Sequence, residues 1–344
     1  MEGQAMTTIA LDHVAGREAA ALLIGGRLDD LLIDSDTPRP GTIYRAIADR
    51  PVKGQGGMFL RTPDGAAFLR QVKGLAPGQP ILVQITGHAE PGKAIPVTAR
   101  VLFKSRYAIV TPEAPGLNIS RAIKDEQERL RLHEIAHEEM GEGAMGLILR
   151  SACEGAADEA IAEDIRAMRD LAQAVLADAS GREPEKLVEG DGPHALAWRD
   201  WPEPAELVDG EGSFATLGVL DALDALRLPE LRLAGGGMAC IEPTRALVAV
   251  DVNTGADTSP AAGLKANLAL ARALPRELRL RGLGGQIVLD LAPMPKKDRR
   301  LFEDALRAAF RRDEIETVLA GWTPLGHYEL QRKRARLPLA DLPG

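Results

Sequence analysis

The sequence predicts an α/β protein, α+β across several domains, and three features of the chain lead to that prediction. Its 344 residues are enough for more than one compact unit with a core of its own. Short strand-like runs broken by Pro and Gly fill residues 36–110, whereas residues 118–180 show helical periodicity. From residue 226 onward strand and helix patterns alternate, which is typical of an α/β unit.

The composition narrows the class of protein. Charged residues make up 27% and hydrophobic residues 45% of the chain, as in globular proteins. We find no apolar run long enough to span a membrane, and the opening MEGQAMTTIALDHV lacks the features of a secretory signal. The cysteines Cys153 and Cys240 form no CxxC pair, which supports neither a disulfide scaffold nor a cysteine zinc site. We therefore expect a cytoplasmic protein without a membrane span.

Charge is distributed unevenly along the chain. The net charge is −8, yet residues 261–344 hold 16 Lys and Arg against 10 Asp and Glu. A basic C-terminal part on an acidic chain suggests a local anionic partner. A solvated helix face explains the same charges equally well.

The N-terminal half reads as strands followed by helices. The first 35 residues resemble strands joined by turns, with Gly25-Gly26 as a hairpin turn, and residues 36–110 resemble a small barrel or sandwich. NISRAIKDEQERLRLHEIAHEEM predicts one charged helix capped by Asn118 or Ser120. The strand MGLILRSA and a second helix, EAIAEDIRAMRDLAQAVLADA, follow. Residues 181–212 read as a loop or linker.

The stretch 246–290 predicts a strand–helix–strand crossover. ALVAVDVN forms the first strand, in which alternation places Asp251 and Asn253 on one face, and QIVLD forms the second strand, ending at Asp290. Because such a crossover makes the strands parallel, both carboxylates fall at the same end of the sheet. Two carboxylates and an amide suit Mg²⁺. Alternatively, each Asp caps the loop after its strand.

Three motifs give the chain a family resemblance. IEPTRALVAVDVNTG, KANLALARALPRELRLRGLGGQIVLDLAPM and LGHYELQRKR closely resemble the catalytic core of the RNase E/G family of bacterial endoribonucleases. The resemblance implies that Asp251, Asn253 and Asp290 are catalytic and hold one magnesium ion, with Asp251 and Asp290 as the metal carboxylates. It also implies a role in RNA processing, including rRNA processing and mRNA decay.

The resemblance also implies a domain plan. Residues 1–35 and 181–225 correspond to a truncated RNase H-like subdomain, into which an OB-type RNA-binding barrel (36–110) and a helical 5′-end sensor region (111–180) are inserted. Residues 226–344 correspond to a DNase I-like α/β catalytic domain.

Phe59 and Phe68 match the barrel aromatics on which RNA stacks in the family, although core aromatics of a small barrel are the alternative. Lys93 fits a basic barrel loop near RNA. Arg150 and Ser151 match the family's 5′-phosphate sensor, where Arg and hydroxyl donors grip a terminal monophosphate. A structural Arg paired with a carboxylate is the alternative for Arg150.

Four further cations are expected to neutralise RNA phosphates, namely Arg279, Arg281, Lys296 and Lys297, unless they are ordinary surface charge. His133 and His137 lie four positions apart on a charged helix without an HExxH pattern. We therefore interpret them as a solvated face rather than a metal pair.

The chain also departs from the family pattern. It has no CPxC zinc-link after the core and no C-terminal small domain, so we expect no zinc and a monomer or weak homodimer. Pro293 stands where the family commonly has a further acidic residue. We predict a magnesium-dependent endoribonuclease that cuts single-stranded RNA to 5′-phosphate and 3′-hydroxyl ends. The alternatives are a catalytically degenerate RNA-binding protein on the same scaffold and an α/β hydrolytic domain acting on another phosphodiester.

Overall fold

The computed structural model describes residues 6–52, 56–90, 92–141 and 143–342, so the opening segment examined for a secretory signal lies partly outside them. The chain divides into two compact units. Unit 1 joins Met1–Ser35 to Pro204–Gly344, and unit 2 comprises Asp36–Glu203. Both units contain helices and strands, which confirms the predicted mixed α/β architecture. The expected N-terminal subdomain differs in one boundary, because residues 181–203 belong to unit 2.

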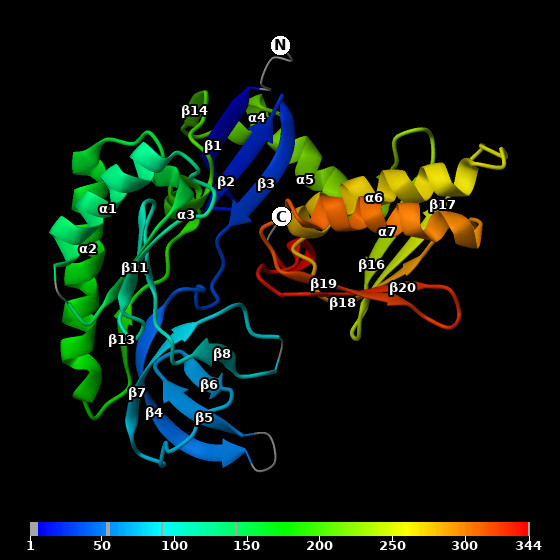
Figure 1. Ribbon diagram of the computed structural model, residues 1–344. Helices are drawn as coiled ribbons and strands as arrows, with labels where there is room; N and C mark the ends of the chain where they lie inside the picture. The colour runs from blue at the N-terminus through cyan, green and yellow to red at the C-terminus, as the bar shows by residue number, and fades with distance from the viewer. Residues whose placement is uncertain (1–5, 53–55, 91, 142, 343–344) are drawn as a thin grey trace. The chain divides into compact units, whose positions relative to one another are not determined.

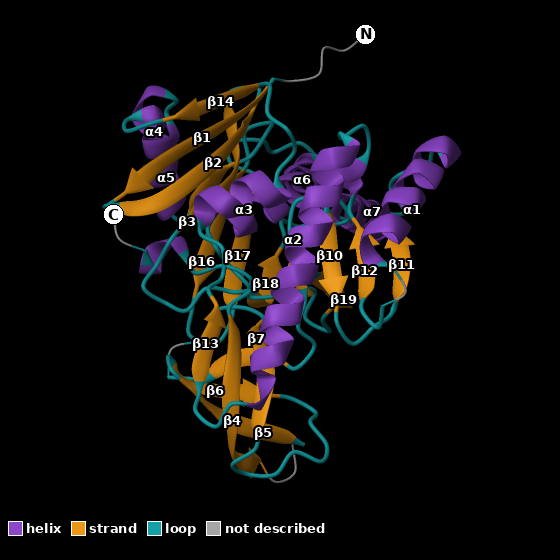
Figure 2. Cartoon of the chain, turned by 90° about the vertical axis from the view of Figure 1, so that its left-hand side faces the viewer, coloured by secondary structure: helices purple, strands orange, loops and turns teal. Residues whose placement is uncertain are grey.

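The first sheet of unit 1 joins strands from the start of the chain to a strand from beyond residue 203. β1 (Thr7–Val14), β2 (Arg17–Ile24) and β3 (Arg27–Ile33) form an antiparallel meander, and β14 (Glu206–Asp209) pairs in parallel with β1. The predicted turn at Gly25-Gly26 is confirmed, since both residues have positive φ, 58° and 76°. Figure 2 shows β14, β1 and β2 side by side, with the helices α4 (Ser213–Thr216) and α5 (Val219–Arg227) against them.

The second sheet of unit 1 contains the predicted crossover. Its strand order is β15-β16-β17-β18-β20-β19, and β17 runs parallel to β18. Helices α6 (Ala262–Leu280) and α7 (Arg299–Phe310) cover one face (Figure 1). Alternate residues of each strand fill the core beneath these helices, which leaves the other residues on the opposite face. The strands are β15 (Glu230–Arg232), β16 (Met238–Pro243), β17 (Val248–Asn253), β18 (Gly285–Asp290), β19 (Thr317–Trp322) and β20 (Tyr328–Arg332).

Unit 2 begins with a closed five-strand barrel, consistent with the OB type (Figure 1). β4 pairs with both β5 and β7, which closes the barrel, and β13 pairs with the first residues of β4. The barrel strands are β4 (Ile43–Val52), β5 (Gly57–Thr62), β6 (Gly65–Leu69), β7 (Pro80–Ile85) and β8 (Ile95–Thr98), and the added strand is β13 (Glu185–Val188).

A second sheet of unit 2, in the order β11-β12-β10-β9, packs against helices α1 (Glu126–Met140) and α2 (Asp158–Ala177). The short helix α3 (Pro193–Asp200) follows β13. The strands are β9 (Phe103–Lys104), β10 (Ala108–Thr111), β11 (Gly116–Ile119) and β12 (Gly146–Leu149). None of the helices described is long and apolar enough to cross a membrane.

One predicted helix start is wrong. Asn118 lies in β11, paired in parallel with β12, so neither it nor Ser120 caps α1. The cap is Asp125, whose carboxylate accepts a hydrogen bond of 2.8 Å from the amide of Glu128. Strand pairing overrides the local helical pattern here. His133 and His137 are exposed on α1, as expected.

Candidate active site

The two aspartates lie side by side on neighbouring strands of unit 1. Asp251 on β17 is the register partner of Asp290 on β18. Both side chains are exposed, while Val250, Val252 and Leu289 point to the opposite, buried face. The strand alternation read from the sequence thus places both carboxylates on the sheet face that α6 and α7 leave uncovered.

Two polar side chains flank this carboxylate pair. The side-chain amide of Asn253 donates a 2.7 Å hydrogen bond to Oδ2 of Asp251. On the other side, Nε2 of His327 lies 3.7 Å from Oδ1 of Asp290. Sequence reasoning missed His327 as a neighbour of this site. His327 lies just before β20, and the pairing of β20 with β18 brings it beside Asp290.

The thiol of Cys240 shares the same face, because Cys240 on β16 is the register partner of Asp251. Its partial burial raises the pKa of the thiol, and the nearby carboxylates of Glu242, Glu230 and Asp251 raise the pKa further. The thiolate is the form that binds soft metals, so these neighbours disfavour Cys240 as a metal ligand.

A buried amide positions the chain after Asp290. Asn267 on α6 is fully buried, and its side chain makes two hydrogen bonds to the backbone of Ala292. Its Nδ2 donates to the carbonyl of Ala292 at 2.8 Å, and its Oδ1 accepts from the amide at 3.0 Å. This pair of hydrogen bonds fixes the loop that follows Asp290. A polar residue at an apolar position of the helical pattern was its signal in the sequence.

The donor set fits magnesium. Two exposed carboxylates and an amide supply oxygen ligands only, and Mg²⁺ is usually bound through one or two carboxylates while keeping several waters. Within the described ranges, no three His, Cys, Asp or Glu side chains cluster closely enough to hold a metal ion.

In unit 2, the two barrel phenylalanines face outward. Phe59 and Phe68 are register partners on β5 and β6, half-buried, with ring centres 5.3 Å apart. The guanidinium of Arg50 lies 5.0 Å from the centre of the Phe59 ring. A Cβ at Gly57 would come within 2.3 Å of the Phe68 ring, so only glycine lets this ring lie across the strand. The barrel interior is filled instead by aliphatic residues, among them Met58, Leu60, Ala67 and Leu69.

The expected barrel-loop cation is exposed. Lys93 has a side chain that is 66% exposed and forms an ion pair of 2.9 Å with Glu90. Such an exposed pair is weak and does not prevent Lys93 from meeting a phosphate.

The expected sensor arginine is held by the protein itself. One terminal nitrogen of Arg150 donates to the carbonyls of Ser105, Arg106 and Arg199, at 2.6, 3.2 and 2.9 Å. The other donates to Asp200 at 2.7 Å. This is the contact that the structural alternative for Arg150 anticipates.

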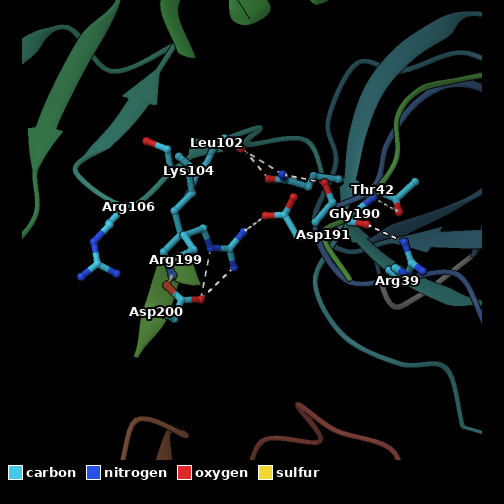
Figure 3. A network of polar contacts seen from close by, with 12 residues as sticks. Arg39, Thr42, Leu102, Lys104, Arg106, Gly190, Asp191, Arg199 and Asp200 are labelled. Atoms are coloured by element: carbon cyan, nitrogen blue, oxygen red, sulfur yellow. Dashed lines mark hydrogen bonds and ion pairs between the residues drawn. The ribbon is translucent and has the colours of Figure 1, made fainter. Parts of the chain in front are cut away.

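Asp200 lies among three cations. Its carboxylate accepts from Lys104 at 2.6 Å, from Arg199 at 2.8 Å and from Arg150; Figure 3 shows Lys104, Arg199 and Asp200 together. Burial alone would raise the pKa of Asp200, but hydrogen bonds from Arg199 and Lys104 lower it to about 2. Asp200 is therefore an anion at neutral pH and neutralises part of this cluster.

Two of the four cations expected to contact RNA are inside unit 1 instead. The Arg279 side chain is 13% exposed and forms ion pairs with Asp29, Asp30 and Asp313. The Arg281 side chain, 7% exposed, donates to the carbonyl of Leu228 and lies near Glu277. Burial and pairing place both within the protein's own ionic network rather than on an RNA-facing surface.

The other two cations of that set, Lys296 and Lys297, are exposed in a short 3₁₀ turn before α7, where a backbone phosphate can reach them.

Comparison with known proteins places the chain in a family. The sequence pattern of the Ribonuclease E/G family matches residues 103–206 and 199–335. The match covers more than half of the chain, and the chain therefore belongs to the Ribonuclease E/G family.

Individual relatives are similar in sequence to almost all of the chain. It is 27% identical to the Ribonuclease E of Nostoc sp. (strain PCC 7120), over 95% of this chain and 56% of the relative. It is 28% identical to the Ribonuclease G of Salmonella typhimurium (strain SL1344) and to that of Escherichia coli (strain K12), over 96% of this chain and 81% of each relative. The chain thus spans little more than half the length of the Nostoc protein.

Proposed function

We propose that this protein is a Mg²⁺-dependent endoribonuclease that cuts single-stranded RNA to 5′-phosphate and 3′-hydroxyl ends, in cytoplasmic RNA processing and mRNA decay. The observation that carries the proposal is the register pair of exposed carboxylates, Asp251 and Asp290, in a chain of the Ribonuclease E/G family. Relatives across the chain's length carry the name ribonuclease.

The proposed chemistry assigns a task to each side chain. Asp251 and Asp290 would hold Mg²⁺, which when bound lowers the pKa of a water and polarises a phosphoryl oxygen. Asn253 donates to Asp251 and so orients that carboxylate, and its amide also lies on the face where the scissile phosphate would sit. Lys296 and Lys297 would neutralise backbone phosphates.

The direct test is incubation of a 5′-monophosphorylated single-stranded RNA with the protein, with Mg²⁺ or with EDTA. We expect Mg²⁺-dependent internal cleavage and products that a ligase requiring 5′-phosphate accepts. The second candidate, an RNA-binding protein that has lost catalysis, rests on Pro293, which is exposed and offers no carboxylate beside the site. RNA binding without any cleavage would favour that candidate.

The barrel phenylalanines provide a prediction on RNA affinity. Phe59→Ala or Phe68→Ala is expected to weaken binding of single-stranded RNA by roughly 1–3 kcal/mol per lost stack, because the rings lie outside the barrel core and every base has a face to stack. Fluorescence anisotropy with labelled RNA in EDTA measures the effect. Leu60→Ala, inside the barrel, serves as the contrast: it should lower the melting temperature first. Full affinity in both Phe variants would leave the rings a structural role only.

The 5′-end preference is a prediction placed on Arg150 and Ser151. We expect wild-type protein to cleave RNA with a 5′-monophosphate on the order of ten-fold faster, in kcat/KM, than RNA with a 5′-hydroxyl, and Arg150→Ala to abolish that ratio. A monophosphate must take the place of Asp200 on the guanidinium to be bound there. If Arg150→Ala instead lowers stability and slows both substrates alike, Arg150 is structural.

A metal analysis tests the prediction on zinc. We propose that the purified protein contains no stoichiometric zinc, because its Cys240 thiol is held protonated and Cys153 is buried in the other unit. We also propose that the protein is a monomer or a weak homodimer. Elemental analysis after dialysis, with sedimentation velocity on the same sample, checks both points; one zinc per chain would contradict the prediction.

A further inference from the structure

An exposed tryptophan marks a second surface of unit 2. Trp198, on α3, is 62% exposed, whereas Trp201, three residues on, is 6% exposed and packs inward. A tryptophan normally buries most of its ring, since it carries one of the largest apolar surfaces of any side chain. The chain has only three tryptophans. An indole left in water is therefore a candidate contact for a ligand with a flat, apolar face.

A cation fixes this indole in place. The guanidinium of Arg106, in the turn between β9 and β10, lies 4.4 Å from the centre of the Trp198 ring. Arg106 also donates a hydrogen bond to the carbonyl of Trp198. The guanidinium thus contacts the ring and also binds the backbone that carries it, and such preorganisation lowers the entropic cost of binding.

The helix beneath the ring is itself anchored. α3 begins with Pro193 at its first turn, and Ala197 is buried against the rest of unit 2. Arg199 ties its end to the preceding loop through Asp191 at 2.5 Å and binds Asp200 within the same turn (Figure 3). The indole therefore projects from a rigid element.

Charge around the indole selects the kind of partner. Lys104, Arg106, Arg150 and Arg199 lie in this neighbourhood, against the three carboxylates of Asp164, Asp191 and Asp200. The excess of positive charge attracts a polyanion and disfavours an apolar or basic peptide. A flat apolar face beside cations matches single-stranded nucleic acid, in which bases alternate with phosphates.

We propose that Trp198, backed by Arg106, is a stacking platform for one base of single-stranded RNA. The proposal rests on the RNA substrate of the proposed function and adds a contact on α3, an element that the barrel phenylalanines do not share. The base stacks on the indole, and Arg106 lies beside it where a flanking phosphate can reach. Because every base has a π-face, the platform is tolerant of sequence.

The first measurement is affinity for a 3′-fluorescein-labelled adenosine oligonucleotide with a 5′-hydroxyl, in EDTA so that nothing is cleaved. We expect Trp198→Ala to weaken binding about ten-fold and Trp198→Phe to restore most of it. Leu130→Ala is the matched control, because Leu130 on α1 is 63% exposed and should leave affinity unchanged. Trp198→Ala should leave the salt dependence of binding intact, whereas Arg106→Ala should reduce it.

Intrinsic fluorescence gives an independent readout. Stacking is expected to quench tryptophan emission on addition of the unlabelled oligonucleotide, and Trp198→Phe should remove that quenching although Trp201 and Trp322 remain. An oligonucleotide of abasic sugar phosphates should bind wild type and Trp198→Ala alike.

The outcomes separate this proposal from the nuclease. Unchanged affinity and unchanged quenching in the Trp198 variants, with RNA cleavage intact, overturn the platform alone. Trp198-dependent binding without cleavage supports the platform and overturns the nuclease. Absence of any RNA binding overturns both.

Discussion

Replacing Asp251 or Asp290 with alanine is expected to slow RNA cleavage by at least about 10²-fold while RNA binding survives. The two carboxylates are register partners on parallel strands, so each would supply half of the acidic ligands of the proposed metal site. Removing either leaves a single carboxylate to hold Mg²⁺ at neutral pH, and the ion is then held weakly and without fixed orientation. Both side chains are exposed, so the truncation opens no cavity in the core.

A neighbouring carboxylate gives the matched control. Glu242 on β16 is exposed and pairs in register with Ala249. Glu242→Ala removes one negative charge from the same part of the sheet and should leave cleavage within a few-fold of wild type. Single-turnover cleavage of labelled RNA and anisotropy in EDTA measure the two properties separately.

The dependence on metal concentration provides a second readout. Asp251→Asn and Asp290→Asn keep the shape of the side chain and lose its charge, so residual activity should require more Mg²⁺ for half-maximal rate. Near wild-type activity in both Asp251→Ala and Asp290→Ala would contradict the assignment of the metal site.

The candidate site could be predicted from the sequence because it depends on local rules. Alternation within ALVAVDVN fixes the face of Asp251, and a right-handed crossover of ordinary length makes the strand ending at Asp290 its parallel neighbour. Both rules act over a few tens of residues. The turn at Gly25-Gly26 was predictable for the same reason, since its conformation is set by two adjacent glycines.

Long-range pairing set the features that the sequence did not reveal. Asn118 reads as a helix cap, yet it pairs with β12, which lies beyond α1 in the chain. His327 lies beside Asp290 only because β20 pairs with β18. The contact between Arg106 and Trp198 likewise joins segments far apart in sequence, namely the turn after β9 and α3.

Arginine is the residue for which sequence reasoning is weakest. The C-terminal part does carry an excess of positive charge. A guanidinium, however, can bind a phosphate or pair with carboxylates in a buried ionic network. Arg279 and Arg281 were expected to contact RNA, and both are enclosed by partners from β3, α5 and the loop after α7. Only the arrangement of these partners in space separates the two roles.

The buried ionic network around Arg279 gives the second large predicted effect, which is on the stability of the fold. Asp313, 1% exposed, accepts hydrogen bonds from Arg279 and from Arg332, whose side chain is fully buried. Two nitrogens of Arg332 have no hydrogen-bond partner among the described residues, so Asp313 is the main compensation for its charge. Asp313→Ala would leave two guanidiniums buried without that carboxylate.

We therefore expect Asp313→Ala to lower the free energy of unfolding by about 3–5 kcal/mol, as for other broken buried ion pairs, and Arg279→Ala to be destabilising in the same direction. Asp313→Asn, which keeps the shape and an accepting oxygen, should cost less. Lys296→Ala, at an exposed cation, should stay within about 0.5 kcal/mol of wild type in stability but bind RNA more weakly, with a shallower salt dependence. Urea unfolding followed by tryptophan emission and circular dichroism, beside salt-dependent RNA binding, separates the two classes of cation. If Arg279→Ala keeps full stability and loses RNA affinity as Lys296→Ala does, then Arg279 contacts RNA and the buried network does not hold unit 1 together.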